Sequence, residues 1–377
     1  MSQVIFGMKY NALRAPEYRF VVKALEQSNI RVSAIVQAAF LKVGRLDKYL
    51  FPESIRGRNQ FLGFITSLLK SRFKMTLESK AKAEAEANNG NAGDEDSNSI
   101  IQNGNVFTFL EKAKDPHSDK FLSVQQIRAE CATLVVAGSD TSSSTLAATL
   151  FYLGNNYLSY KRAAGEVRNA FPSGGTVTMG PQLNKCVYLR ACIDEALRLS
   201  PPVGGALWRE VGPGGMTVDG IHIGEGFDVG TGIYSLHHNE KYHPEPFAYR
   251  PERWLAGWTK DGDGQSSSPF RPQSEQVAKE AVELGRSAFV PFSSGPRSCV
   301  GKGFAYHELM LTLATLLQRY NFEYKDNATR LSSLKEKKEQ NSSTAGMGPG
   351  GKGEFLLRDH ITGAKNGPLL RFTSRTT

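Results

Sequence analysis

Cysteine is scarce in this chain of 377 residues, and its spacing excludes one common role. Four cysteines are present, Cys131, Cys186, Cys192 and Cys299. They form no regularly spaced set of the kind that crosslinks small secreted domains. The N-terminus reads MSQVIFGMKY and has no secretory signal pattern. The sequence therefore predicts free thiols in a reducing compartment.

Long apolar runs are also missing. No stretch approaches the roughly 18 consecutive apolar residues of a membrane-spanning helix, although 40% of the residues are hydrophobic, enough for a substantial core. We expect a globular chain without an anchor of its own, which would be cytoplasmic as written. Membrane association is expected only for a form that carries an additional N-terminal anchor.

The positive charge is not concentrated in one place. The net charge is +9, yet no Lys/Arg cluster is interleaved with aromatic residues, so nucleic-acid binding is not predicted. A surplus of this size is compatible with a membrane surface or an acidic protein partner, but it is too diffuse to choose between them.

Residues 1–76 read as a helical region. Apolar residues recur at three- and four-residue spacing over 18–40 and again over 61–73, with an expected break at Pro52. The composition then turns polar, and residues 77–105 are predicted to be a disordered insertion. A second polar insertion is predicted over residues 261–285.

A long helix is predicted over residues 123–155. Ser123 and Gln126 fit a capping box at its start. Near the middle stands AGSDTS, where Gly138 costs about 1 kcal/mol against alanine and the hydroxyls compete for backbone carbonyls. We expect a local bulge or kink there, at a place where a ligand or water passes.

Shorter elements follow. A helix over 186–200 should stop at Pro201 and Pro202, and Asp219 and Gly220 suit a hairpin turn. A helix over 304–320 has one apolar stripe, and residues 355–372 read as two strands around a turn.

The loop FSSGPRSCVG, residues 292–301, has the most distinctive chemistry. Cys299 precedes a predicted helix, whose dipole and unpaired N–H groups favour the thiolate, so it could serve as a metal ligand or a nucleophile. Gly295 and Gly301 allow tight turns, and Arg297 adds a cation. A lone thiolate is wrong for tetrahedral zinc and suits the axial position of a haem iron.

The residues around Cys299 also allow two other interpretations. It could be a buried structural cysteine beside a surface arginine. It could also be the nucleophile of a Cys-His hydrolase with His307, but His307 would lie roughly 9 to 12 Å further along the helix, beyond hydrogen-bond reach.

The pattern FxxGxRxCxG resembles the haem-binding loop of the cytochrome P450 family, with every defined position present. These positions are Phe292, Gly295, Arg297, Cys299 and Gly301. The resemblance implies that Cys299 is the axial thiolate and that Arg297 pairs with a haem propionate.

Other segments extend the resemblance. AGSDTS is similar to the oxygen-activating segment of the family, which implies that Asp140 and Thr141 relay protons to bound dioxygen and that Gly138 leaves room beside the haem. The family's buried ionic network behind the haem would comprise the ExxR pair and the arginine of PERW, here Glu195, Arg198 and Arg253. We interpret these three as structural.

The remaining correspondences concern the pocket. Arg209 matches a second arginine that pairs with a propionate, and residues 203–207 match a substrate-facing segment. The C-terminal segment resembles the family's hairpin, which would bring Ile361 and Thr362 toward the pocket.

The resemblance implies a mainly α fold with small β-sheets, the cytochrome P450 fold without its N-terminal part. It would form a single domain over 1–377, with a haem-binding core over 121–320 and a tail over 321–377 that carries the hairpin. The family's anchor, first strands and a haem-contacting helix have no counterpart in the sequence. The alternative is therefore a truncated, catalytically impaired haem-fold fragment without an enzymatic role.

The implied reaction inserts one oxygen atom from O₂ into a lipophilic small molecule at haem b. Electrons would come from NADPH through NADPH-cytochrome P450 reductase. The sequence is similar to filamentous-fungal members, which implies secondary-metabolite or toxin biosynthesis. A full-length form would work at the cytosolic face of the endoplasmic reticulum membrane.

Overall fold

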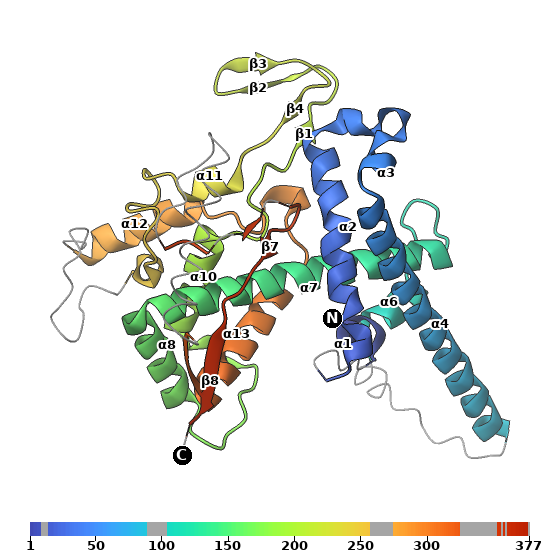
Figure 1. Cartoon of the computed structure of the whole chain (residues 1–377), viewed down its shortest axis with the longest axis horizontal. Helices are drawn as coiled ribbons and strands as arrows, with labels where there is room; N and C mark the ends of the chain where they lie inside the picture. The colour runs from blue at the N-terminus through green and yellow to red at the C-terminus, as the bar shows by residue number, and fades with distance from the viewer. Residues whose placement is uncertain are drawn as a thin grey trace. The chain divides into compact units, whose positions relative to one another are not determined.

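The computed structural model describes residues 1–8, 14–88, 104–256, 274–324, 353–355, 357–358 and 360–375. The chain divides into two compact units, residues 1–140 and 141–377. The boundary lies between Asp140 and Thr141, inside one continuous helix, α7 (Val124–Asn155), which Figure 1 shows as a long green ribbon.

The first unit is helical. Besides the first part of α7 it contains α1 (Ser2–Phe6), α2 (Phe20–Gln37), α3 (Leu46–Leu50), α4 (Pro52–Asn88) and α6 (Val106–Lys112), with 3₁₀ turns η1 (Pro16–Tyr18) and η2 (Ala39–Arg45). The buried side chains of its core come from five of these helices and include Ile5, Phe6, Ala24, Phe61, Ile65, Phe107, Cys131 and Val135.

Two boundaries in this unit differ from the sequence-based prediction. The break expected at Pro52 is present, since α3 ends at Leu50 and α4 begins at Pro52, where proline gives up only an N–H that has no helical partner. The helix predicted over 61–73 therefore begins earlier, at Pro52. The helix also continues to Asn88, into the segment 77–105 that was predicted to be disordered. Alanine, lysine and glutamate, which favour helix, fill that extension. Residues 89–103 lie outside the described residues.

Helix α7 has the predicted start. The Ser123 N–H donates to Gln126 Oε1 at 2.8 Å, and the Gln126 N–H donates to Ser123 Oγ at 3.3 Å. The predicted bulge in AGSDTS does not interrupt the helix. Thr145 Oγ1 donates to the Thr141 carbonyl, four residues back, at 3.0 Å. This is the usual hydrogen bond of a threonine inside a helix, and it leaves the helix continuous.

The second unit has its largest core among helices. These are the end of α7, α8 (Tyr157–Ala170), α9 (Pro181–Asn184), α10 (Val187–Leu199) and α13 (Lys302–Arg319). Helix α10 is buried from Tyr188 to Leu199 apart from Arg190. It ends before Pro201 and Pro202, as predicted.

Smaller elements complete this unit. They are α11 (Ile233–His237), α12 (Glu275–Ser287), η3 (Pro251–Trp254) and η4 (Gly295–Arg297). Within the polar insertion predicted over 261–285, Ser274 caps α12 by accepting the Val277 N–H at 3.3 Å, so the last residues of that stretch are helical. Residues 257–273 lie outside the described part of the chain.

The described residues of the second unit contain four two-stranded antiparallel ladders. β1 (Arg209–Glu210) pairs with β4 (Asp228–Val229), and β2 (Met216–Val218) pairs with β3 (Ile221–Ile223). β5 (Tyr320–Tyr324) pairs with β8 (Leu370–Ser374), and β6 (Leu357–Arg358) with β7 (Ala364–Lys365). The C-terminal segment therefore contains the predicted hairpin, β6–β7, and a further strand.

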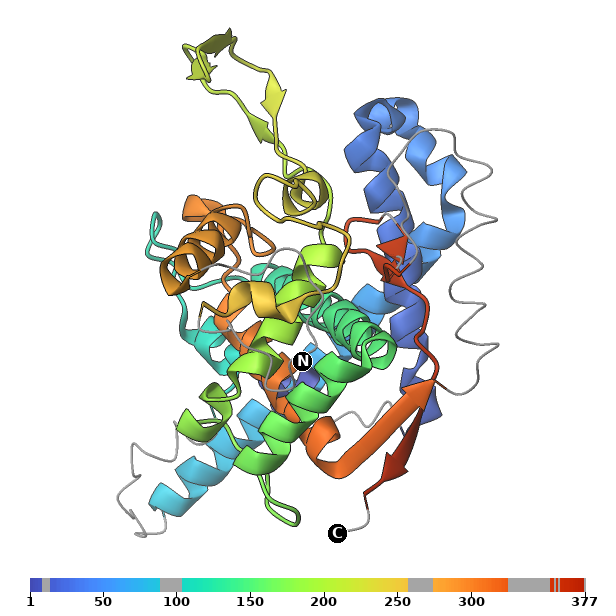
Figure 2. The ribbon, with the colours of Figure 1, turned by 90° about the vertical axis from the view of Figure 1, so that its left-hand side faces the viewer.

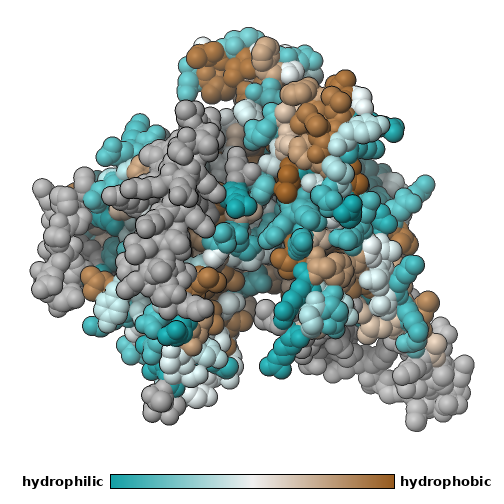
Figure 3. Space-filling model, viewed as in Figure 1, coloured by the Kyte–Doolittle hydropathy of each residue, from teal (hydrophilic) through white to brown (hydrophobic). Residues whose placement is uncertain are grey.

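The hairpin β2–β3 turns at Asp219 and Gly220, as predicted. Both have positive φ, 48° and 80°, the conformation that such a turn requires and that glycine tolerates best. The hairpin extends away from the helices of its unit (Figures 1 and 2), and its apolar residues Met216, Val218 and Ile221 are exposed (Figure 3). None of the described helices is long and apolar enough to cross a membrane.

Candidate functional site

The loop over residues 292–301 presents the sulfur of Cys299 just ahead of α13. The Cys299 N–H donates to the Phe292 carbonyl at 2.8 Å, and the Ser298 N–H to the Gly295 carbonyl at 3.0 Å. This tight closure requires positive φ at Ser293 and Gly295, 59° and 72°. Glycine supplies that conformation at little cost in one of the two positions.

Cys299 differs from the other three cysteines in its exposure. Cys131, Cys186 and Cys192 are buried, whereas Cys299 is exposed and free. Burial raises the pKa of Cys131 and of Cys186 to about 11 and the pKa of Cys192 well above its ordinary value. Those three remain thiols, so Cys299 is the cysteine available to a ligand. The interpretation as a buried structural cysteine is wrong.

The neighbours of Cys299 suit a flat, apolar, anionic group. Val300 is 95% exposed, and Arg297 is exposed and forms no ion pair within the described residues. A soft thiol, an uncovered apolar side chain and an unpaired cation form a donor set that fits a haem with its carboxylate edge.

Phe292 and Gly301 join the two ends of the loop to helix α13. The Phe292 ring packs 5.1 Å from that of Tyr306, whose hydroxyl donates to Asp194 at 2.8 Å, so Phe292 anchors the loop to α13. Gly301 is the N-cap of α13. A side chain added there would begin 3.8 Å from Cys299 Sγ, an ordinary contact distance.

Arg209 lies on β1 and has no carboxylate partner among the described residues. Its guanidinium donates to the carbonyls of Trp208, at 2.8 Å, and Leu207, at 3.4 Å. It is exposed. The Arg209 guanidinium is thus held by the two preceding backbone carbonyls, and its other N–H groups can donate to an anion.

Asp140 and Gly138 on α7 both contact residues of their own unit. Asp140 accepts a hydrogen bond from the side-chain amide of Asn29 at 3.1 Å, a residue that no sequence pattern singled out. Gly138 lies against Met1, because an added Cβ would be 2.2 Å from Met1 Cε. Its small size therefore serves the packing of Met1 on α7.

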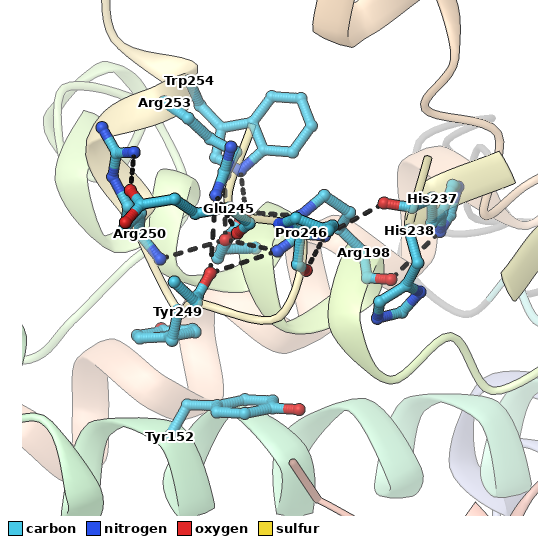
Figure 4. A network of polar contacts seen from close by, with 12 residues as sticks. Tyr152, Arg198, His237, His238, Glu245, Pro246, Tyr249, Arg250, Arg253 and Trp254 are labelled. Atoms are coloured by element: carbon cyan, nitrogen blue, oxygen red, sulfur yellow. Dashed lines mark hydrogen bonds and ion pairs between the residues drawn. The ribbon is translucent and has the colours of Figure 1, made fainter. Parts of the chain in front are cut away.

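The predicted ionic network is present and buried (Figure 4). Arg198 Nη2 lies 2.9 Å, and Arg253 Nε 3.0 Å, from Glu195 Oε1. Trp254 Nε1 donates to Glu195 Oε2 at 3.0 Å. Burial raises the pKa of Glu195, but the charges of Arg198 and Arg253 outweigh it and lower the pKa to about 2.

A buried histidine links this network to the cysteine loop. Arg198 donates to the His237 carbonyl at 3.0 Å, and His237 Nε2 accepts the Val290 N–H at 3.0 Å, two residues before Phe292. Burial, then the charges of His243 and Arg198, lower the pKa of His237 to about 3. The neutral ring can therefore accept this hydrogen bond. No motif in the sequence pointed to it.

Three segments assigned to the pocket by resemblance meet in the second unit. The Gly363 N–H donates to the Pro202 carbonyl at 2.6 Å, and Ser144 Oγ on α7 donates to the Gly363 carbonyl at 3.1 Å. Thr362 is buried, and Ile361 is exposed. The C-terminal hairpin thus lies beside α7 and next to the segment 203–207.

Known proteins match the chain over most of its length. The family model described as cytochrome P450 matches residues 1–342. Cytochrome P450 monooxygenase apf8 of Gibberella fujikuroi is 56% identical over 375 residues, 100% of this chain and 88% of that protein. Cytochrome P450 monooxygenase AKT7 of Alternaria alternata is 41% identical over 381 residues, 99% of this chain and 63% of that protein.

A third similar protein is cytochrome P450 monooxygenase poxM of Penicillium oxalicum, 40% identical over 374 residues, 99% of this chain and 60% of that protein. The chain thus spans less than two thirds of the length of two of these three relatives.

Proposed function

The chain belongs to the cytochrome P450 family, and we propose that it binds haem through the Cys299 thiolate and inserts one oxygen atom from O₂ into a lipophilic small molecule. The observation that carries the proposal is the exposed Cys299, presented at the start of α13 by a closed loop. Bound haem would supply the oxygen activation, and the Cys299 thiolate would donate electron density to it.

The protein residues divide the remaining work. Arg297 and Arg209 would hold the two propionates, because each guanidinium is exposed and has no carboxylate partner among the described residues. Phe292 and Gly301 would hold the loop around the sulfur. Glu195, Arg198 and Arg253 would fix the scaffold through His237 and Val290.

Asp140 and Thr141 would deliver the protons that the reaction consumes. Conversion of RH and O₂ to ROH and water takes up two electrons and two protons, and a carboxylate beside a hydroxyl can pass protons inward. Gly138 would allow α7 to pack closely at this point, where Met1 fills the space left by the missing side chain. Residues 203–207, Ile361 and Thr362 would face the substrate.

The proposed cofactor is haem b, and the proposed electron source is NADPH through NADPH-cytochrome P450 reductase. Similarity to fungal monooxygenases supports a role in fungal secondary metabolism. The proposed place of action is the cytosolic face of the endoplasmic reticulum, where that reductase would dock on the basic chain.

The test is turnover of the haem-loaded chain with the reductase and NADPH under ¹⁸O₂, using lauric acid and a panel of lipophilic fungal metabolites as probes. We expect an NADPH-dependent product carrying one ¹⁸O atom, absent with Cys299→Ser. With Thr141→Ala, product per NADPH should fall. Failure to convert any probe, with haem bound and NADPH oxidised, would contradict the proposal.

A further inference from the structure

Asp140 is hydrogen-bonded to a residue on a distant part of the sequence. Asn29 Nδ2 on α2 donates to Asp140 Oδ2 on α7 at 3.1 Å, across 111 positions of the chain. Both side chains are half-buried. The contact lies within the first unit and therefore belongs to one compact body.

The backbone on either side of Asn29 is fixed by other contacts. Five residues earlier, Ala24 is buried against α4, where a Cβ on Gly57 would come within 2.8 Å of the Ala24 carbonyl oxygen. Two residues later, Arg31 Nε donates to the buried carboxylate of Asp47 at 2.6 Å. Asn29 thus extends a short side chain from a well-anchored helix, which limits the positions its amide can take.

The chemistry of the donor matters as much as its position. An arginine or lysine at this place would favour the ionised carboxylate by its charge. An amide orients one carboxylate oxygen without contributing a full charge. A group that passes protons must change its own protonation state, so a neutral donor suits it.

We propose that Asn29 is a positioning residue that orients the Asp140 carboxylate for proton delivery during oxygen activation. This inference rests on the role proposed above for Asp140. The Asn29 amide fixes Oδ2, and the carboxylate thereby keeps one orientation relative to the backbone of α7.

The experiment compares five variants of the haem-loaded chain, four single substitutions and one double. Asn29→Leu removes the donor at similar volume, Asn29→Gln keeps an amide, and Ser28→Ala alters the neighbouring half-buried position as a control. Asp140→Asn is made alone and with Asn29→Leu. Hydrogen peroxide released per NADPH oxidised is measured with the reductase, in H₂O and in D₂O, and unfolding midpoints are measured for every variant.

We expect Asn29→Leu to raise peroxide release several-fold and to enlarge the solvent isotope effect, because protons then arrive late. Asn29→Gln, which keeps an amide, should show a smaller rise in peroxide release than Asn29→Leu. Ser28→Ala should release as much peroxide as wild type. In the Asp140→Asn background Asn29→Leu should add nothing. The shifts in unfolding midpoint caused by Asn29→Leu and Asp140→Asn should be non-additive in the double variant. This double-mutant cycle detects the contact between the two side chains independently of enzyme activity.

Two outcomes would overturn the assignment. Peroxide release by Asn29→Leu equal to that of Ser28→Ala would show that the amide is not needed. If Asn29→Leu raised peroxide release equally in the Asp140→Asn background, the effect of Asn29 would not pass through Asp140. A wild-type chain without a thiolate-type ferrous carbonyl spectrum would instead overturn the proposed function itself, and the midpoints would still decide whether the two side chains interact.

Discussion

The buried Glu195 carboxylate forms ion pairs with two buried arginines, Arg198 and Arg253. Glu195 and Arg198 are fully buried, and Arg253 is nearly so. Such a network fixes geometry more than it adds net stability, yet removing one charge leaves others uncompensated.

Glu195→Gln should therefore lower the free energy of unfolding by about 3 to 5 kcal/mol. The matched control is Glu53→Gln, whose pair with Arg56 is more than half exposed on both sides; that change should cost no more than about 1 kcal/mol. Chemical unfolding measures both. Equal effects of the two substitutions would argue against a buried network.

His243 makes stability depend on pH. Burial, then the charges of Arg198 and Arg253, lower its pKa from 6.5 to about 3, and its Nε2 has no hydrogen-bond partner among the described residues. Between pH 6.5 and 3 the His243 imidazole is therefore protonated in the unfolded chain but neutral in the folded chain. The free energy of unfolding falls as pH is lowered through that window, and the lowered pKa of His237 acts in the same direction.

His243→Phe should reduce this slope. At pH 8 the variant should stay within about 1 kcal/mol of wild type, and at pH 5 it should be more stable than wild type by on the order of 2 kcal/mol. Exposed His117, replaced by Gln, is the control and should leave the slope unchanged. Unfolding curves that keep the wild-type pH slope in His243→Phe would contradict the prediction.

Sequence patterns predict residues whose chemistry is visible in their type and spacing. Glu195, Arg198 and Arg253 were predicted to form a buried network, and they do. Asn29 and His237 were not predicted, because an amide or an imidazole in a helix has no distinctive spacing. Their roles depend on which helix packs beside them.

At the scale of elements, the approach of α2 to α4 depends on one glycine. A Cβ on Gly57 would lie 2.8 Å from the Ala24 carbonyl oxygen and 2.9 Å from Gln27 Cβ, so backbone would have to move. Gly63, on the same helix, has nothing within 4 Å of its Cβ position.

Gly57→Ala should destabilise the first unit by about 1 to 3 kcal/mol, whereas Gly63→Ala should stabilise it by up to about 1 kcal/mol through helix propensity. Denaturant unfolding followed by circular dichroism compares the two. The same sign for both substitutions would mean that α2 does not pack closely against Gly57.

Elements with strong local signals were predicted well. The capping box of α7, the prolines after α10 and the turn at Asp219 and Gly220 act over a few residues and need no tertiary context. Helix α12 and the end of α4 were missed, because polar helices resemble disordered segments in composition. Capping by Ser274 distinguishes α12, but a single serine is a weak pattern.

At the scale of the whole molecule, the family and its mainly α fold could be predicted because the loop at residues 292–301 has five defined positions. The division into two units inside α7 could not, because the helix itself is continuous and gives no composition change at Asp140. The segments proposed to face the substrate rest on resemblance alone, whereas the hydrogen bonds that join Ser144, Gly363 and Pro202 could be found only from the fold.

The central claim, that Cys299 is the thiolate ligand of a haem, has a direct measurement. The chain is reconstituted with haem, reduced and exposed to carbon monoxide, and its absorption spectrum is recorded for wild type, Cys299→Ser and the buried-cysteine control Cys186→Ser. We predict the red-shifted carbonyl band of a thiolate-bound haem in wild type and Cys186→Ser, and its loss in Cys299→Ser. Persistence of that band in Cys299→Ser would contradict the account.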